Sequence, residues 1–312
     1  MGARAAVSGS GQMKIDVERL SATLADRLGR SGLKFAPIDV ACAWQVFKVT
    51  SPDGAPLFVK LADPARARQT RMFLTSVPAA PFLPQVVLDE PLAFDGYDLL
   101  VLDWMESTCV NAEDMSDAQF AAFADGCRSL SSVLAAYRGE LRPVGEDDPD
   151  LQWSRLSAYA VRHPLAGRLL RPLLEIPVER RSYGSRALVT IHGDFQPRNY
   201  GFRGERFAAV FDFDALTTGL ACEDAVYAFT ERARRAELAA AKRRRLTELF
   251  LRLVGMSPWP KDEWFVAVNH ARLRIAARRL DKHPDLPFVA LDIAQRDRPL
   301  RRLAVALEGE SC

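Results

Sequence analysis

The chain has 312 residues, of which 48% are hydrophobic and 26% charged, and its formal net charge is +2. This length exceeds one ordinary core and predicts two lobes, while a net charge so close to zero does not by itself indicate any partner. Five cysteines without a Cys-x-x-Cys pair and four scattered histidines suggest neither a disulfide framework nor a zinc site, which favours a reducing, cytoplasmic location.

The sequence predicts no membrane span and no targeting segment. Its apolar stretches fall short of the roughly 18 residues that a span needs. The first residues lack the apolar region of a signal peptide. Residues 1–12, which are small and polar, are expected to be disordered or left over from expression.

The N-terminal part of the chain predicts a helix followed by a β-hairpin. Apolar residues recur at helical spacing over residues 16–29, with Asp at the start and Gly at the end. Strand-like runs at 35–50 and 56–62 flank Ser51-Pro52-Asp53-Gly54, which suits a type I turn. Lys60 lies inside the second strand, where the pattern alone favours a side chain that points to solvent.

A second helix and a second hairpin follow. The helix is predicted from Asp63-Pro64, an N-cap with a first-turn proline, to about Val77. Strands at 85–94 and 97–104 are joined by Asp95-Gly96, a dipeptide typical of tight hairpin turns.

Most of the remaining chain is helical by its pattern. Ser116 and Gln119 form a capping box for a helix that extends to about Arg138. A polar loop is expected at 139–150. Helices are then expected at 151–174 with an interruption near His163-Pro164, at 219–229, 231–254, 260–280 and 289–308.

Two short apolar runs between these helices each end close to a carboxylate. The runs, at 187–191 and 207–211, predict buried strands, and Asp194 and Asp212 follow them. Asp212 follows Asn199 by thirteen positions, which leaves room for one hairpin. Asn199 can therefore share a space with both carboxylates. Such hard oxygen ligands suit Mg²⁺ that also binds phosphates and water.

These residues resemble a known family. The run His192-Gly193-Asp194-Phe195-Gln196-Pro197-Arg198-Asn199 resembles the catalytic loop of the aminoglycoside phosphotransferase family of small-molecule kinases, and Asp212-Phe213-Asp214 resembles its metal-binding strand end. The resemblance implies an α+β, two-lobed protein-kinase-like fold with a small N-terminal antiparallel sheet lobe and a larger, mainly helical C-terminal lobe. It implies a nucleotide-binding lobe at 13–104 and a catalytic and substrate lobe at 105–312.

The resemblance also implies roles in catalysis. Asp194 is expected to orient and partly deprotonate the acceptor hydroxyl, and Asn199 and Asp212 to bind Mg²⁺. Gln196 stands where Ser/Thr protein kinases carry a Lys, and a neutral amide supplies no charge. Arg198 is therefore expected to be the substitute cation at the transferring phosphate.

For the nucleotide, ATP or GTP, the resemblance implies contacts from the first lobe and its end. Lys60 is expected to bind the α- and β-phosphates, which reverses the solvent-facing interpretation. The segment Asp103-Trp104-Met105 is expected to bind the base through its backbone. Residues expected to support the site without binding substrate are Gln196, Asp214, His192 and Asp224, the last capping the catalytic loop from below.

Two features of the family pattern are missing. Residues 39–44 contain no glycine for a phosphate-covering loop, and the helix after Asp63 contains no Glu to hold Lys60, since Gln69, Thr70 and Arg71 occupy the candidate positions. The alternative function is therefore a nucleotide-binding pseudokinase acting as a regulatory module, against which the three converging oxygen residues argue. No recognised module supports a nucleic-acid binder. The sequence leaves the oligomeric state unknown.

The composition of the late helices bears on the small-molecule hydroxyl acceptor. Between residues 231 and 302 basic residues outnumber acidic ones about two to one. If these helices line the acceptor side, the acceptor is more readily neutral or anionic than a polycationic aminoglycoside. Arg272 and Arg279, seven residues apart, are expected to share one face with Arg278 beside it. The other arginines considered are Arg234, Arg235, Arg243, Arg244 and Arg274.

Overall fold

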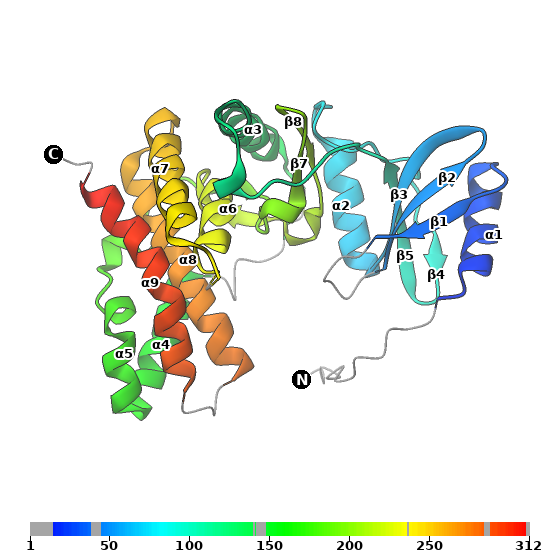
Figure 1. The fold of residues 1–312 in the computed structure, drawn as a ribbon. Coiled ribbons are helices and arrows are strands. Elements are labelled where there is room, and N and C mark those ends of the chain that lie inside the picture. Colours follow the sequence, from blue (N-terminus) through cyan, green and yellow to red (C-terminus); the bar gives the residue numbers. More distant parts are fainter. Residues whose placement is uncertain are drawn as a thin grey trace. The chain divides into compact units, whose positions relative to one another are not determined.

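The computed structural model describes residues 15–38, 45–139, 141, 148–235, 237–283 and 288–309. Its ribbon is shown in Figure 1. The chain divides into two compact units, residues 1–67 with 86–104 and residues 68–85 with 105–312. The expectations for residues 1–12 and for the glycine-free segment 39–44 lie outside the described residues.

The first unit is an antiparallel sheet with one helix. Helix α1 (Val17–Leu28) begins after Asp16, whose carboxylate accepts from Arg19 N, and ends at Gly29, which adopts the left-handed conformation (φ +61°). The five-stranded sheet has the order β1-β2-β3-β5-β4. Its strands are β1 (Lys34–Pro37), β2 (Val46–Ser51), β3 (Gly54–Ala62), β4 (Ala93–Phe94) and β5 (Tyr97–Asp103).

Both predicted hairpins are present, although two predicted strands are shorter. Strand β2 pairs with β3 across the turn at Pro52-Asp53, but the expected run 35–50 is divided between β1 and β2. At the second turn Asp95 and Gly96 both have positive φ (50° and 83°), as a tight hairpin requires. The expected strand 85–94 was too long. Pro91 has no N–H for the ladder, and the Leu92 amide donates to the Asp98 side chain.

The second unit is mainly helical and carries two small two-stranded sheets, β6 with β9 and β7 with β8. These strands are β6 (Val189–Ile191), β7 (Tyr200–Arg203), β8 (Arg206–Val210) and β9 (Thr217–Gly219). The helices are α3 (Asp117–Ala136), α4 (Pro149–Arg162), α5 (Pro164–Leu174), α6 (Glu223–Ala233), α7 (Ala240–Met256), α8 (Lys261–Lys282) and α9 (Val289–Gly309). The capping box at Ser116 and the interruption at His163-Pro164 are both confirmed.

Helix α2 (Pro64–Ser76) changes the expected division of the chain. Asp63 caps its start by accepting from Ala65 N and Arg66 N. Residues 68–85 nevertheless group with the second unit, not with residues 13–67 as expected. The reason is packing: Phe73 is fully buried, with its ring centroid 4.8 Å from that of Phe213 and 5.4 Å from that of Tyr137.

The expected helix 231–254 is wrong in one respect. Helix α6 ends at Ala233 and α7 begins at Ala240. No Gly or Pro marks this break in the sequence. Instead the Arg243 guanidinium donates to the carbonyls of Ala233, Arg235 and Leu238, which compensates for the helical hydrogen bonds lost there. None of the described helices is long and apolar enough to span a membrane.

Candidate active site

The second unit presents the loop that follows strand β6. The Asp224 carboxylate, in the first turn of α6, accepts from His192 N at 2.7 Å and from Gly193 N at 3.0 Å. Gly193 has φ +77°, and a Cβ there would collide with the Ala215 carbonyl. Two buried backbone hydrogen bonds and an obligatory glycine thus fix the loop just before Asp194.

His192 is fully buried and its ring bridges two backbone segments. Its Nδ1 lies 3.3 Å from Asp194 N, and its Nε2 lies 2.7 Å from the Phe211 carbonyl. Because an amide can only donate, Nδ1 accepts and Nε2 carries the proton that it donates to Phe211. Both ring nitrogens are therefore engaged, and the neutral imidazole is suited to bracing the loop, not to carrying a proton.

The two oxygens of Asp194 have different surroundings. Oδ2 accepts from Gln196 Nε2 at 2.8 Å and from Asn199 Nδ2 at 3.0 Å. The Arg198 guanidinium, half exposed, lies 3.8 Å from the same oxygen. No residue of the described part of the chain makes a hydrogen bond to Oδ1. One oxygen is thus held in place, while the other can accept a hydrogen bond from a substrate.

The β7–β8 hairpin places Asp212 beside Asn199. Phe211 N donates to the Asn199 carbonyl at 2.8 Å, and Tyr200 pairs with Val210 in the ladder. Gly204 turns this hairpin with φ +63°. The Asn199 side-chain nitrogen is engaged by Asp194, so its oxygen is the atom left for a cation.

Asp212 itself adopts the left-handed conformation, with φ +62°, which is strained for a residue with a Cβ. A neutral amide oxygen and a carboxylate are hard ligands that fit Mg²⁺ with phosphates and water in its other positions. No group of three or more His, Cys, Asp or Glu among the described residues could hold a metal on its own.

The segment after Asp212 contacts α2. Strand β8 ends at Val210 and residues 213–215 form a 3₁₀ turn, so Asp214 does not continue a strand. Its Oδ1 lies 3.4 Å from Thr70 Oγ1, and Gln69 Nε2 donates to the Leu216 carbonyl at 3.3 Å. The sequence indicated Gln69 and Thr70 only as the place of a missing Glu. The structure shows that they contact Leu216 and Asp214, which follow Asp212 in the chain.

In the first unit Lys60 is buried, with 4% of its surface exposed. It lies in β3 between Val46 of β2 and Leu100 of β5. The solvent-facing interpretation that the pattern alone favoured is therefore wrong, because both faces of β3 are buried from Val59 to Ala62. The role of Lys60 in nucleotide binding is a proposal, which is taken up below.

The predicted base-binding segment spans the end of β5. Asp103 pairs with Leu57 in the ladder, and Trp104 N donates to the Pro56 carbonyl at 3.1 Å. Lys48 Nζ lies 4.3 Å from the Trp104 ring centroid. Met105 belongs to the second unit. The Trp104 amide is thus already engaged within its own sheet.

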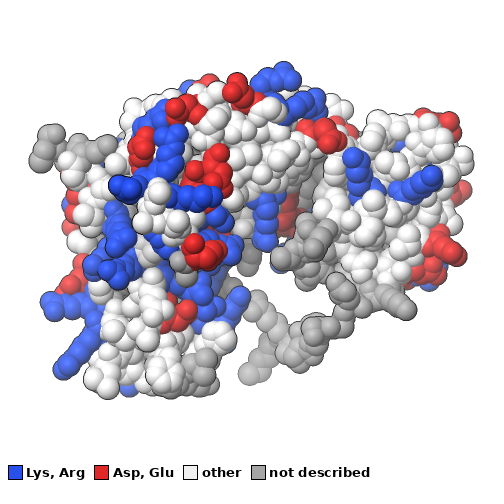
Figure 2. All heavy atoms as spheres, in the orientation of Figure 1, with Lys and Arg blue, Asp and Glu red and all other residues white. Residues whose placement is uncertain are grey.

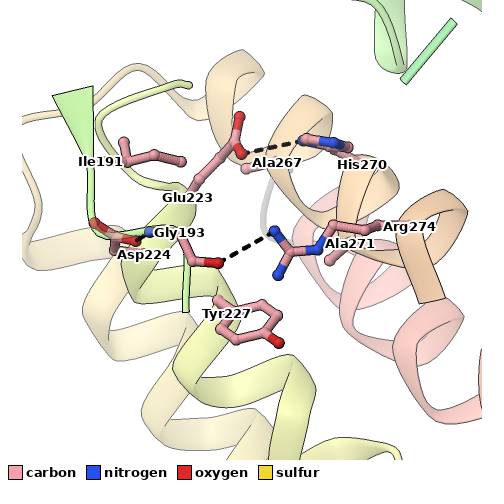
Figure 3. A pocket seen from close by; sticks show the side chains of 9 residues that line it. All are labelled: Ile191, Gly193, Glu223, Asp224, Tyr227, Ala267, His270, Ala271 and Arg274. Atoms are coloured by element: carbon pink, nitrogen blue, oxygen red, sulfur yellow. Dashed lines mark hydrogen bonds and ion pairs between the residues drawn. The ribbon is translucent and has the colours of Figure 1, made fainter. Parts of the chain in front are cut away.

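Helices α6 and α8 support the catalytic loop through a buried polar cluster (Figure 3). His270 Nδ1 lies 3.1 Å from Glu223 Oε2 and 2.9 Å from the Tyr183 hydroxyl. Arg274 donates to the Gly193 carbonyl at 3.4 Å and lies over the Tyr227 ring, 4.2 Å from its centroid. Sequence reasoning considered Glu223 only together with Asp224 and missed His270 and Tyr183, because only packing brings these residues together.

The two neighbouring carboxylates of α6 have net pKa shifts in opposite directions. Burial raises the pKa of Asp224, and hydrogen bonds from the His192 and Gly193 amides offset this only in part. Burial also acts to raise the pKa of Glu223, but attraction to His270 and hydrogen bonds from His270, Leu220 and Tyr183 bring the net shift below the ordinary value. Glu223 is therefore held as a carboxylate by its partners.

The arginines expected to line an acceptor site are largely engaged in structural pairs. Arg272 is buried and donates to Asp297 at 2.7 and 3.0 Å, and Arg279 donates to Asp292 at 2.6 Å. Arg272 and Arg279 thus share the face of α8 that meets α9, as their spacing predicted, but there they neutralise acids of α9. Arg274 serves the catalytic loop. The other engaged arginines are Arg234 and Arg235, both paired with Glu231, and Arg243.

A family model described as APH, phosphotransferase enzyme family, matches residues 37–259. No curated protein matches the chain in sequence. Among solved structures, amicoumacin kinase hAmiN in complex with AMP-PNP, Ca²⁺ and Ami has a TM-score of 0.59 at 13% identity, covering 95% of this chain and 94% of that chain.

Two further solved structures are similar over most of the chain. A thermostable mutant of aminoglycoside phosphotransferase APH(4)-Ia, in ternary complex with ADP and hygromycin B, has a TM-score of 0.56 at 14% identity, covering 90% of this chain and 98% of that one. Macrolide 2′-phosphotransferase MphH from Brachybacterium faecium has a TM-score of 0.51 at 16% identity, covering 93% and 98%. These similarities show the fold, which is the two-lobed, α+β protein-kinase-like fold.

Proposed function

The chain belongs to the APH phosphotransferase enzyme family, and from this premise we propose that it transfers the γ-phosphoryl group of ATP or GTP, with Mg²⁺, to a hydroxyl group of a small molecule. The observation that carries the proposal is the pair of environments around Asp194. Its Oδ2 is held by Gln196 and Asn199, its Oδ1 is open, and Asn199 lies beside Asp212.

In the proposed reaction Asp194 Oδ1 accepts a hydrogen bond from the acceptor hydroxyl and takes its proton as the oxygen bonds to the γ-phosphorus. The bond from that phosphorus to its bridging oxygen breaks, which leaves a nucleoside diphosphate. Asn199 and Asp212 would hold Mg²⁺, which neutralises phosphate charge when bound. Arg198, 3.8 Å from Asp194, is positioned to add a second positive charge.

Lys60 of the first unit would contact the α- and β-phosphates, and the segment 103–105, at the end of that unit and the start of the second, would bind the base. Because the Trp104 amide already donates to Pro56, we assign the donor to the base to Met105 N. The three converging oxygen residues favour this enzyme over the pseudokinase alternative, since a scaffold has no chemical use for them.

For the acceptor we propose a neutral or anionic compound instead of a polycationic aminoglycoside. The arginine count supports this acceptor less than expected, because acids of α9 neutralise Arg272 and Arg279. The proposal uses instead the charge of Arg198, a half-exposed residue of the catalytic loop. A polycationic acceptor would meet repulsion there.

The test is a phosphate-transfer assay with ATP or GTP and Mg²⁺ against sugars, carboxylate-bearing alcohols and kanamycin-like polyamines. Asp194→Asn, which keeps the size of the side chain, serves as the catalytic control. We expect turnover of at least one neutral or anionic alcohol that the control lacks. Turnover of polyamines alone would overturn the acceptor proposal, and nucleotide binding without any transfer would favour the pseudokinase.

A further inference from the structure

A hollow of about 570 Å³ lies on the second unit between the end of α6, the start of α7 and the middle of α9. Figure 2 shows Lys and Arg side chains gathered over the region of α7 and α9 on the visible face. The hollow is within the size range of small-molecule sites. Its charged lining consists of Arg234, Arg235, Arg243, Arg296, Arg298 and Arg302 with only Glu237 and Asp292.

One side of the hollow is held rigidly. Three backbone carbonyls hold the Arg243 guanidinium in one orientation, as described above. Arg234 and Arg235 both pair with Glu231, whose side chain is only 5% exposed. Two guanidinium groups thus share one carboxylate, which leaves net positive charge on this wall.

The α9 side carries the cations that have no partner in the described part of the chain. Arg296 pairs with Asp292, but Arg298 and Arg302 make no hydrogen bond or ion pair with a described residue. They are four residues apart on one helix, where like charges destabilise each other. Pro299 lies between them and has no N–H, so the Gln295 carbonyl loses its usual helical hydrogen bond.

We propose that this hollow binds a small molecule that carries two or more phosphate groups, at a site separate from the catalytic residues. Guanidinium forks on converging helices match phosphate oxygens through paired, charge-assisted hydrogen bonds. A multivalent anion would relieve the repulsion between Arg298 and Arg302 while contacting the opposite wall. None of the lining residues belongs to the proposed reaction, so this site does not depend on the proposed function.

The test is calorimetric titration with pyrophosphate at fixed ionic strength and without divalent cations. The double variant Arg298→Ala/Arg302→Ala is compared with Arg301→Ala, which removes an exposed arginine of the same helix that does not line the hollow. We expect saturable binding by the unaltered chain, a loss of ~10-fold or more in the double variant, and a change of less than ~2-fold in Arg301→Ala.

Three outcomes would overturn the proposal. The first is that pyrophosphate does not bind. The second is that the double variant binds it as well as Arg301→Ala does. The third is that both variants lose affinity equally, which would reflect only the lower net charge.

Titration with a single-stranded oligonucleotide tests whether the surface binds a macromolecule instead. If the oligonucleotide binds more tightly than pyrophosphate and depends on Arg301 as well, the surface is an extended polyanion site and not a small-molecule hollow. Because Arg298 and Arg302 are exposed, both variants should fold, and circular dichroism checks this.

Discussion

The catalytic loop of the second unit and the Lys60 strand of the first unit serve the same proposed reaction with unequal support. The loop is held by Asp224, by both nitrogens of His192 and by Arg274 on the Gly193 carbonyl. Lys60 is positioned by burial within a sheet. In α2 the positions expected for a Glu carry Gln69 and Thr70, which contact the chain after Asp212 instead.

This difference indicates where the reaction depends on exact geometry. The residues that would contact the reacting oxygen and the metal lie in one unit, on a backbone fixed by buried hydrogen bonds. The residues expected to bind the nucleotide lie in the buried strand β3 and at the end of β5. Damage to the loop should therefore affect the chemical step, whereas damage to the strand should affect nucleotide binding.

The largest effect is expected for Asp194→Ala. It removes the open Oδ1 and the acceptor of the Gln196 and Asn199 hydrogen bonds, so turnover should fall at least ~100-fold. Nucleotide affinity in a thermal-shift titration should stay nearly unchanged, because Asn199 and Asp212 remain. If Asp194→Ala also lost nucleotide binding, the role of Asp194 could not be separated from that of Asn199 and Asp212.

Asp212→Ala is expected to remove Mg²⁺-dependent stabilisation by nucleotide. The carboxylate is the charged member of the Asn199–Asp212 pair, and an amide oxygen alone is a weak ligand. Melting temperature is measured with ATP in the presence of Mg²⁺ and of EDTA. Asp214→Asn is the matched control, since Asp214 contacts Thr70 and should retain the Mg²⁺ dependence. If Asp214→Asn abolished the Mg²⁺ dependence instead, Asp214 and not Asp212 would be assigned as the metal ligand.

The helix caps could be predicted from sequence because they depend on local residues, such as Ser116 and Gln119, which are three residues apart. The run 192–199 could be recognised by its resemblance to a known loop, whereas the Phe211 carbonyl and Arg274 that hold it are distant in sequence. The break between α6 and α7 could not be predicted, since it depends on Arg243 reaching back to three carbonyls.

The acceptor-side arginines were misjudged for the same physical reason. A count of charges between 231 and 302 does not show that Arg272 pairs with Asp297, or Arg279 with Asp292. Likewise the burial of Phe73 against Phe213 and Tyr137, which assigns most of α2 to the second unit, is a long-range contact. Contacts between residues distant in sequence thus determine both the arginine pairs and the grouping of α2.

A smaller effect is expected for Lys60→Ala. Without a Glu in α2, the lysine is expected to contribute mainly to phosphate binding, so the nucleotide KM should rise while kcat falls less than in Asp194→Ala. Lys48→Ala, which removes a lysine over the Trp104 ring of the same sheet, controls for general damage. Unchanged KM and kcat in Lys60→Ala would mean that the buried lysine is only structural. The first unit would then not bind the nucleotide phosphates through this residue.

The smallest effect concerns Glu223, which joins α6 to α8 through His270. Burial acts to raise its pKa, but attraction to His270 and hydrogen bonds from His270, Leu220 and Tyr183 bring the net pKa below the ordinary value of 4.5. Because the carboxylate is favoured in the folded state, its stabilising contribution is present above about pH 4.5 and is lost as the pH falls through the folded pKa.

Glu223→Gln should therefore lower the free energy of unfolding at pH 7, and the difference from the unaltered chain should shrink as the pH falls below about 4.5. Urea unfolding followed across this range measures it. Glu205→Gln, at an exposed position of the β7–β8 turn, should show no such pH dependence. A difference that stays constant or widens toward acid would mean that the partners of Glu223 do not hold it as a carboxylate. The buried cluster would then support the loop by packing alone.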